Sequence, residues 1–254
     1  MSVEKFVIKN RDSYELHAEY YRIGANSKSD VLFILCHGFS GDKYEWGRFE
    51  KAAKKIVERG WDAIFFDFSG SGENERIPIT LDNQIRDLED VALWGIQSGY
   101  SSLVTIGLSF GGITSLFAKV PNRKVAVFWA PAFNMKRVVG EVRKKLAYMI
   151  LSIKKTPIKT FAKVKPILID KSFFESIWSK NPWELLRNFD IPSIIVQGTK
   201  DKAVIPSDSQ MAFDFMKKDG KHELHFVEGA THDFDKEHLE EFIKVSLDFV
   251  EKCL

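Results

Sequence analysis

The sequence is poor in cysteine, with 2 such residues among 254. Cys36 lies within an apolar run and Cys253 lies next to the carboxyl terminus, so they resemble neither a disulfide framework nor a metal-ligand cluster. A protein without disulfides suits a reducing compartment. We therefore expect a cytoplasmic protein that contains no structural metal site.

Long hydrophobic runs and an excess of one charge are also absent. No stretch reaches the ~18 apolar residues of a membrane-spanning helix, and the amino terminus lacks the apolar segment of a secretory signal. The 37 Lys and Arg against 35 Asp and Glu give a net charge of +2, which provides no reason to expect nucleic acid. We expect neither secretion nor stable membrane insertion, and a homo-oligomer is left open.

Hydrophobic residues make up 44% of the chain and charged residues 28%, a balance typical of globular proteins. We expect one domain spanning residues 1–254, although the length would also suit two small domains. Apolar segments such as Val31–Cys36 alternate with segments of helical periodicity, which predicts a mostly parallel sheet with helices on both faces. An antiparallel hairpin over 3–9 and 14–23 should form a sheet edge. We expect further strands at 63–66, 103–106, 124–129, 193–197 and 223–227, and helices at 49–57, 81–96, 113–119, 211–217 and 239–250.

The alternation of strands and helices breaks between Phe133 and Arg187. Residues 136–180 hold 12 Lys or Arg against 3 Asp or Glu, and residues 138–153 carry apolar side chains at helical spacing. A solvated surface excursion would leave that apolar stripe without a partner. We therefore interpret residues 133–187 as a helical lid that is inserted after the sixth strand and opens with a basic amphipathic helix.

The stretch Leu103–Ala118, LVTIGLSFGGITSLFA, carries the clearest chemical signal. It predicts a strand, a sharp turn at Gly-Leu-Ser-Phe-Gly-Gly, and a helix in immediate succession. Glycines on both sides of Ser109 remove the Cβ atoms that would collide where a strand turns into a helix. Ser109 would then project from the corner beside the positive end of the helix. The alternative is an ordinary glycine-rich turn.

Three polar residues, Ser109, Asp201 and His232, stand in that order in loops that follow predicted buried strands. Such loops lie together at one edge of a parallel sheet. A serine hydroxyl needs a base to remove its proton, and an imidazole oriented by a carboxylate is suited to that task. His232 could instead be a surface histidine. Three other acidic residues compete with Asp201: Asp208, Asp233 and Asp235.

The order serine, acid, histidine is that of the α/β-hydrolases, and the chain resembles this superfamily over nearly its whole length. Four motifs stand in register with the family: His-Gly-Phe at 37–39, Gly-x-Ser-x-Gly-Gly at 107–112, Gly-Thr-x-Asp at 198–201 and Gly-Ala-x-His-x-Phe at 229–234. The resemblance implies an α/β-hydrolase fold in which Ser109 is the nucleophile, His232 the general base and then acid, and Asp201 the orienting carboxylate. It also implies an oxyanion hole made by the backbone N–H groups of Phe39 and Phe110, and neither a metal nor an organic cofactor.

Several other conspicuous residues are expected to have structural roles. His37 should form structural hydrogen bonds rather than transfer protons, and Asp67 resembles part of a tight turn of the family. Further residues expected in the scaffold, the core, the lid or an edge region are Gly70, Gly72, Trp129, Trp178, Trp183, His222 and His225.

The compact size and the single insertion resemble those of feruloyl or cinnamoyl esterases and monoacylglycerol lipases. We therefore expect a serine carboxylesterase that acts on a small-molecule ester through an acyl-enzyme. The first alternative is a serine aminopeptidase or acyl-peptide hydrolase, which would need an acidic group to hold a substrate amine. The insertion offers mainly Asp170, Glu175 and Glu184 for that purpose. The second alternative, a binding protein of the same fold, is disfavoured because all three candidate residues of the triad are intact.

Overall fold

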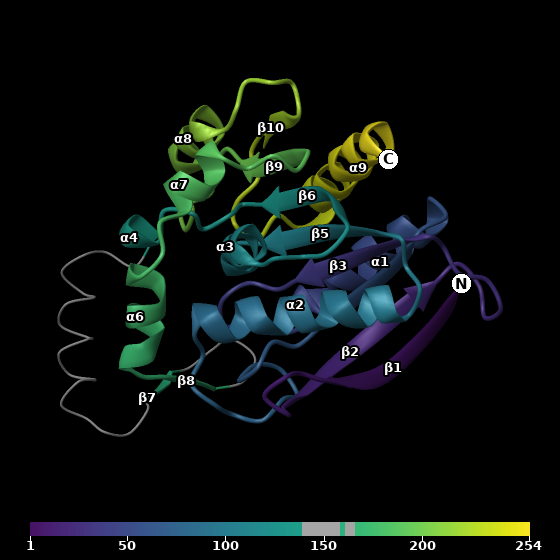
Figure 1. Ribbon diagram of the computed structural model, residues 1–254. Helices are drawn as coiled ribbons and strands as arrows, with labels where there is room; N and C mark the ends of the chain where they lie inside the picture. Colours follow the sequence, from purple (N-terminus) through teal and green to yellow (C-terminus); the bar gives the residue numbers. More distant parts are fainter. Residues whose placement is uncertain (139–157, 161–165) are drawn as a thin grey trace.

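The structure is a computed structural model that describes residues 1–138, 158–160 and 166–254 (Figure 1). Within this described part, eight strands form one sheet in the order β1-β2-β4-β3-β5-β6-β9-β10. The strands are β1 (Ser2–Lys9), β2 (Glu15–Arg22), β3 (Val31–Cys36), β4 (Asp62–Phe66), β5 (Ser102–Leu108), β6 (Arg123–Trp129), β9 (Ser193–Gly198) and β10 (His222–Val227). The β1–β2 hairpin and the β2–β4 pair are antiparallel, and the remaining pairs of this sheet are parallel. The predicted mostly parallel sheet with an antiparallel edge is therefore confirmed.

Helices cover both faces of the sheet, with α2 and α3 on one face and α1 and α9 on the other (Figure 1). The helical elements are η1 (Glu45–Gly47), α1 (Arg48–Glu58), α2 (Leu81–Gln97), α3 (Phe110–Phe117), α4 (Met135–Val138), α6 (Lys171–Trp178), α7 (Pro182–Arg187), α8 (Pro206–Phe215) and α9 (Lys236–Cys253). Three of them, α3, α8 and α9, begin three or more residues earlier than expected from the sequence. The helix predicted from residue 211 begins at Pro206, because proline suits the first turn, where its missing N–H is not needed.

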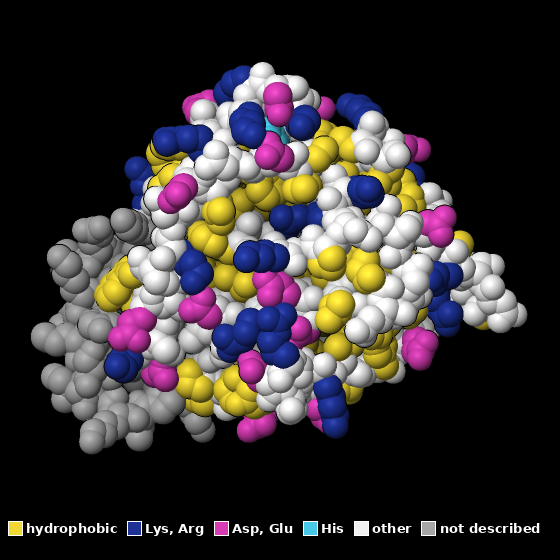
Figure 2. Space-filling model, in the orientation of Figure 1, with side chains coloured by type: hydrophobic (Ala, Val, Ile, Leu, Met, Phe, Trp, Pro, Cys, Tyr) yellow, Lys and Arg dark blue, Asp and Glu magenta, His cyan; other side chains and the backbone are white. Residues whose placement is uncertain are grey.

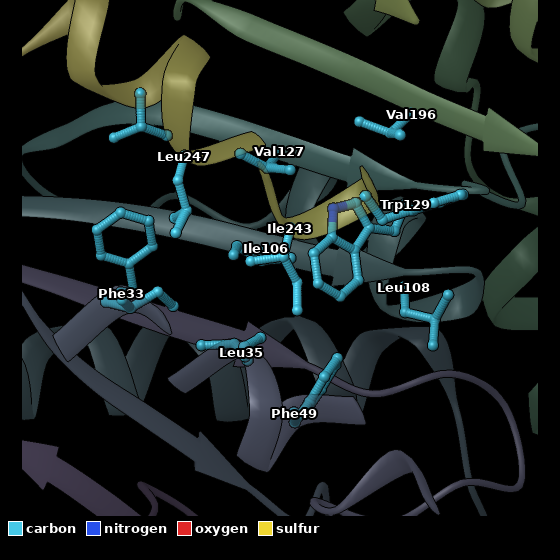
Figure 3. Packing of buried hydrophobic residues seen from close by; sticks show 14 of the residues in the cluster. Phe33, Leu35, Phe49, Ile106, Leu108, Val127, Trp129, Val196, Ile243 and Leu247 are labelled. Atoms are coloured by element: carbon cyan, nitrogen blue, oxygen red, sulfur yellow. The ribbon is translucent and has the colours of Figure 1, made fainter. Parts of the chain in front are cut away.

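The core explains why the central strands are apolar at every position. Successive side chains of a strand point to opposite faces. Phe33 and Leu35 of β3 pack with residues of α1 and α9, whereas Leu32 and Ile34 belong to the cluster under α2. Figure 3 shows the first of these clusters, in which side chains from β3, β5, β6 and β9 meet Phe49 of α1 and residues of α9.

The described parts of the insertion lie against the start of α2. Two short antiparallel strands, β7 (Ile158–Thr160) and β8 (Ile167–Ile169), precede α6. The backbone N–H of Ile79 donates to the carbonyl of Leu168 at 3.0 Å, and the N–H of Leu81 donates to Ser176 Oγ at 3.0 Å. Beyond Val138, the basic amphipathic helix expected over 138–153 lies outside the described residues. That the insertion acts as a lid stays a prediction.

The surface seen in Figure 2 mixes basic and acidic side chains, with apolar side chains between them. Among the described helices, none combines the length and the apolar character needed to cross a membrane. Trp129 is fully buried, and its indole N–H donates to Ser246 Oγ at 2.8 Å, as expected for a core residue.

Candidate active site

Ser109 occupies the corner between β5 and α3, and its backbone is in the left-handed region with a φ of 53°. Such a conformation is unfavourable for a residue with a side chain. The corner is held because the N–H of Ser109 donates to the carbonyl of Trp129 at 2.8 Å and its carbonyl accepts from Gly112 at 3.0 Å. The hydroxyl is thereby presented at the carboxyl edge of the sheet.

The glycines on both sides of Ser109 are required by close contacts between main-chain segments. A Cβ atom on Gly107 would lie 2.5 Å from the carbonyl oxygen of Gly111, and one on Gly111 would lie 2.2 Å from that of Cys36. Both distances are far below a normal contact, and a main-chain segment cannot move aside as a side chain can. Helix α3 begins at Phe110, three residues before the predicted start.

His232 lies between the other two residues singled out by the sequence. Its Nδ1 is 2.7 Å from Asp201 Oδ2, and its Nε2 is 3.1 Å from Ser109 Oγ. A carboxylate can only accept, so Nδ1 carries the hydrogen and Nε2 is free to accept the hydrogen of the serine hydroxyl. The side chain of His232 is 27% exposed and that of Asp201 is fully buried. The arrangement can take a proton from a hydroxyl and stabilise the resulting cation.

Asp201 is held by groups that the sequence analysis did not identify. Its Oδ1 accepts hydrogen bonds from the N–H groups of Ala203 at 2.8 Å and Val204 at 2.9 Å. Its Oδ2 also accepts from Gln197 Nε2 at 3.2 Å, and Gln197 is itself oriented by the hydroxyl of Ser209 at 2.7 Å. Gln197 was missed because it lies within an otherwise apolar strand, where only its polarity marks it as unusual.

The competing acidic residues have other partners. Asp208 accepts from Asn134 Nδ2 at 3.0 Å and from Arg137 Nη1 at 3.1 Å. The side chain of Asp233 is 66% exposed, and Asp235 stands at the start of α9. Of the four candidates, Asp201 is therefore the one that contacts the imidazole of His232.

The two backbone N–H groups expected to form an oxyanion hole belong to Phe39 and Phe110. Neither donates a hydrogen bond to another residue of the described chain. A Cβ atom on Gly38 would lie 3.4 Å from Ser109 Cβ, so the loop that carries Phe39 packs directly beside the serine. Phe110 follows the serine at the amino-terminal end of α3, where N–H groups have no partner within the helix.

Three aromatic rings lie close together at the candidate site. The ring of Phe39 lies 5.8 Å from that of Phe110 and 5.2 Å from that of Phe173 in α6, and the latter two are 5.9 Å apart. Phe110 and Phe173 are buried, whereas Phe39 is 37% exposed. The described part of the insertion thus contributes an aromatic side chain beside the candidate site.

The residues expected to be structural are engaged within the protein. His37 is fully buried, with Nδ1 2.8 Å from the carbonyl of Gly38 and Nε2 3.1 Å from the N–H of Phe68. Asp67 accepts from the N–H and the Nζ of Lys43 at 2.7 and 2.9 Å. His222 is more buried than a position on an edge strand suggests, and its Nδ1 lies 2.9 Å from the hydroxyl of Ser193. Burial lowers the pKa of His222.

Comparisons with known proteins identify a family and a set of structures with the same fold. A model described as the alpha/beta hydrolase family matches residues 33–245, whereas no curated protein matches the chain. GrgF, an alpha/beta hydrolase from Penicillium sp. sh18, is 17% identical with a TM-score of 0.83, over 100% of this chain and 99% of its own. Est1E from Butyrivibrio proteoclasticus with bound ferulic acid is 17% identical with a TM-score of 0.79, over 98% of each chain. The esterase Pf2001 from Pyrococcus furiosus is 18% identical with a TM-score of 0.74, over 99% of this chain and 93% of its own. The chain has the fold of these structures, as the sequence resemblance predicted.

Proposed function

We propose that this chain, which belongs to the alpha/beta hydrolase family, is a serine hydrolase that cleaves carboxylic esters through an acyl-enzyme. The observation that carries the proposal is the position of the His232 imidazole, 2.7 Å from Asp201 and 3.1 Å from Ser109. A nucleophile, a base and a third group that orients the base within hydrogen-bonding distance are what acyl transfer to a hydroxyl requires.

In the acylation step, Ser109 Oγ attacks the ester carbonyl while His232 Nε2 takes the hydroxyl proton. The carbonyl oxygen becomes an alkoxide, and the N–H groups of Phe39 and Phe110 donate to it. Asp201 stabilises the imidazolium through Nδ1–H. Collapse of the tetrahedral intermediate breaks the bond to the alcohol oxygen, which receives the proton from His232 Nε2 and leaves as the free alcohol.

In the deacylation step, a water molecule replaces the alcohol. His232 Nε2 takes a proton from that water as its oxygen attacks the acyl carbonyl, and the two amides again receive the alkoxide. The proton then returns to Ser109 Oγ as the acyl–serine bond breaks. The products are a carboxylic acid and the original serine, so the cycle needs no cofactor.

For the acyl group we favour an aromatic or short acid. The half-exposed ring of Phe39, next to Phe110 and Phe173, provides an apolar aromatic wall beside the serine. The ferulic acid bound to Est1E, a protein of the same fold, supports a hydroxycinnamic ester as the first substrate to test. A monoacylglycerol is the second.

The aminopeptidase alternative has less support. It requires a carboxylate that faces the substrate amine. Asp170 caps α6 by accepting the N–H of Ser172 at 2.8 Å, and Glu184 is exposed in the first turn of α7. The positions of Asp170 and Glu184 at the starts of two helices are therefore explained without a role in binding a substrate amine.

The decisive variant is Ser109→Ala. We expect 4-nitrophenyl acetate to give a burst of nitrophenol with the wild-type protein and Ser109→Ala to lose turnover by at least ~10⁴-fold. The variant removes one oxygen at a partly exposed site, so its melting temperature should stay close to that of the wild type. Unchanged hydrolysis by a folded Ser109→Ala protein would exclude this serine as the nucleophile.

A substrate panel separates the candidate functions. Methyl ferulate, a monoacylglycerol, 4-nitrophenyl acetate and an aminoacyl nitroanilide would be compared by kcat/KM. We expect the esters to exceed the amide. A wide preference for the amide would favour the peptidase, and no turnover of any member together with no labelling of Ser109 by a fluorophosphonate would favour a binding protein.

The role of the insertion has its own test. Removal of residues 136–180 should change the preference between acetate and longer acyl esters more than it changes turnover of the acetate. Equal effects on all chain lengths would mean that the segment is a structural part of the domain.

A further inference from the structure

We propose that Glu45 and Arg48 are positioning residues that hold the oxyanion loop and the histidine loop in register, an inference that rests on the proposed function. The oxyanion loop is defined here as residues 37–41, and the histidine loop as residues 229–234. Neither residue stood out in the sequence, because each looks like an ordinary surface charge near the start of a helix. In the structure, Glu45 is 2% exposed and Arg48 is 7% exposed.

The carboxylate of Glu45 is the hydrogen-bond acceptor for the oxyanion loop. Its Oε1 accepts the N–H of Gly38 at 2.6 Å, one residue before the N–H of Phe39. A Cβ atom on Gly41 would lie 2.4 Å from the same oxygen, so the loop wraps closely around the carboxylate. This bond fixes one end of the loop, and the Gly38 carbonyl, which shares its peptide plane with the N–H of Phe39, accepts from the N–H of Gly41 at 3.2 Å, so the loop that carries the proposed donor to the alkoxide is held around the carboxylate.

Arg48 extends this contact to the histidine loop. Its Nη2 donates to Glu45 Oε2 at 2.8 Å, and its Nη1 donates to the carbonyl of Asp233 at 2.9 Å. Asp233 follows His232 directly. The planar guanidinium also lies over the ring of Phe234, 5.2 Å from its centroid. The guanidinium of Arg48 therefore joins Glu45, which holds the oxyanion loop, to the carbonyl of Asp233, which follows His232.

The main chain around Glu45 adopts an unfavourable conformation. Glu45, Trp46 and Gly47 have φ values of 45°, 55° and 84°, so three consecutive residues are in the left-handed region. Glycine tolerates this region, whereas glutamate and tryptophan adopt it at a cost. Trp46 remains 53% exposed, and the guanidinium of Arg48 lies over its ring, 5.0 Å from the centroid. The result of the conformation is that the Glu45 carboxylate points into the protein, under the oxyanion loop.

The positive charge of Arg48 is as important to the proposal as its hydrogen bonds to Glu45 and to the histidine loop. A carboxylate close to the point where the alkoxide forms would oppose that negative charge, and the paired guanidinium offsets it. Removal of Arg48 alone would leave an unpaired buried carboxylate beside the oxyanion loop. Removal of both charged groups would eliminate this opposition and leave only a looser loop.

The test compares Glu45→Ala, Arg48→Met and the double variant by kcat and KM on 4-nitrophenyl acetate, with the rate of fluorophosphonate labelling of Ser109 as a second readout. We expect Glu45→Ala to lower kcat by ~10-fold to ~100-fold with KM within ~3-fold, because a displaced oxyanion donor acts on the transition state. Arg48→Met should be the most damaging, by ~10²-fold or more, and the double variant should recover to the level of Glu45→Ala.

Glu45→Gln keeps the size of the side chain and an acceptor for the N–H of Gly38, so it covers the case in which Glu45→Ala does not fold. We expect its kcat to lie between those of Glu45→Ala and the wild type. The matched control is Arg59→Met at the other end of α1. Arg59 bonds Glu251 and Asp248 of α9 at 2.5 and 2.6 Å, far from the serine, so its loss should leave kcat within ~2-fold of the wild type.

The outcomes distinguish this inference from the function on which it rests. A wild-type protein that neither cleaves the ester nor reacts with the fluorophosphonate would overturn both. An active wild type, with folded Glu45→Ala and Arg48→Met variants that keep kcat within ~2-fold and lose only melting temperature, would overturn the positioning role alone.

Discussion

His37 and His232 lie in loops that follow strands of the parallel part of the sheet, yet their surroundings differ. His37 is fully buried, with one nitrogen 2.8 Å from the carbonyl of Gly38 and the other 3.1 Å from the N–H of Phe68. His232 is 27% exposed, with one nitrogen on a carboxylate and the other facing a hydroxyl. A histidine that holds two main-chain groups is part of the scaffold, whereas one that joins a carboxylate to a hydroxyl can exchange a proton.

The same contrast separates Asp67 from Asp201. Both are buried, and both follow a strand of the parallel sheet. Asp67 pairs with the fixed charge of Lys43 at 2.9 Å, and Asp201 pairs with the imidazole of His232 at 2.7 Å. The partner, and not the residue type or its place after a strand, separates a structural carboxylate from one that can serve catalysis.

The sharpest test of the comparison exchanges the two histidines for alanine. We expect His232→Ala to lose kcat/KM by ~10⁴-fold or more with little change in the free energy of unfolding. His37→Ala should instead lower the free energy of unfolding by about 2–4 kcal/mol, because it leaves a cavity and removes the hydrogen-bond partner of the buried N–H of Phe68. Ester kinetics and urea denaturation of both variants measure the two effects, and a larger loss of stability in His232→Ala would contradict the assignment.

The carboxylates should separate in the same way, with a somewhat smaller effect on rate. Asp201→Asn should lower kcat by ~10³-fold to ~10⁴-fold, since an amide neither fixes the tautomer nor stabilises the imidazolium. Asp67→Asn should lower the free energy of unfolding by about 3 kcal/mol, because it removes the buried partner of Lys43. If Asp67→Asn has the greater effect on kcat in a folded protein, the division into a structural and a reactive carboxylate is wrong.

A third test asks whether the corner at Ser109 depends on contacts between main-chain atoms. The Cβ of a Gly111→Ala variant would meet the carbonyl of Cys36 at 2.2 Å, which predicts a loss of about 3 kcal/mol or more in the free energy of unfolding. Gly95→Ala in α2 is the control, because its Cβ would meet only side-chain ends, Leu32 Cδ2 at 2.9 Å and Leu103 Cδ2 at 3.4 Å. Melting temperatures measure both variants, and equal losses would show that the corner is no more constrained than an ordinary helix.

The smallest expected effect is a pH dependence of stability in the scaffold. The carboxylate of Asp87 in α2 is buried and accepts hydrogen bonds from the side chain of Asn10 and the N–H of Ser69. Burial raises the pKa of Asp87 from 3.8 to about 6. Because the folded pKa is the higher one, its stabilising contribution is complete below the unfolded pKa and is lost as the pH rises through about 6. The total change is no more than about 3 kcal/mol.

Urea denaturation from pH 4 to pH 7 measures this change against an Asp87→Asn variant, which cannot ionise. The stability of the variant relative to the wild type should increase as the pH rises across this range. A constant difference between the two proteins would show that Asp87 titrates normally in the folded state.

Much of the fold and the outline of the site could be predicted from local patterns. Wholly apolar segments indicated buried parallel strands because both faces of such strands are covered, and alternation over 3–9 and 14–23 indicated the edge hairpin. The starts of α3, α8 and α9 were less predictable, and that of α8 depends on Pro206 in a first turn.

The partners of the polar residues could not be predicted in this way. Ser109, Asp201 and His232 could be selected because each follows a strand in a recognisable motif. The periodicity of the chain does not indicate that Gln197 donates a hydrogen bond to Asp201. It also does not indicate that Arg48, which pairs with Glu45, bonds the carbonyl of Asp233, 185 residues away along the chain.

Local sequence periodicity therefore specified the strands, the helices and the edge of the sheet at which the reactive groups lie, because each pattern reports which faces of its own segment avoid water. Hydrogen-bond partners depend instead on distances between segments far apart along the chain, and those distances exist only once the sheet and helices have packed. The motifs predicted which histidine and which carboxylate react, but the contacts that distinguish them from the structural pair form only at that second level.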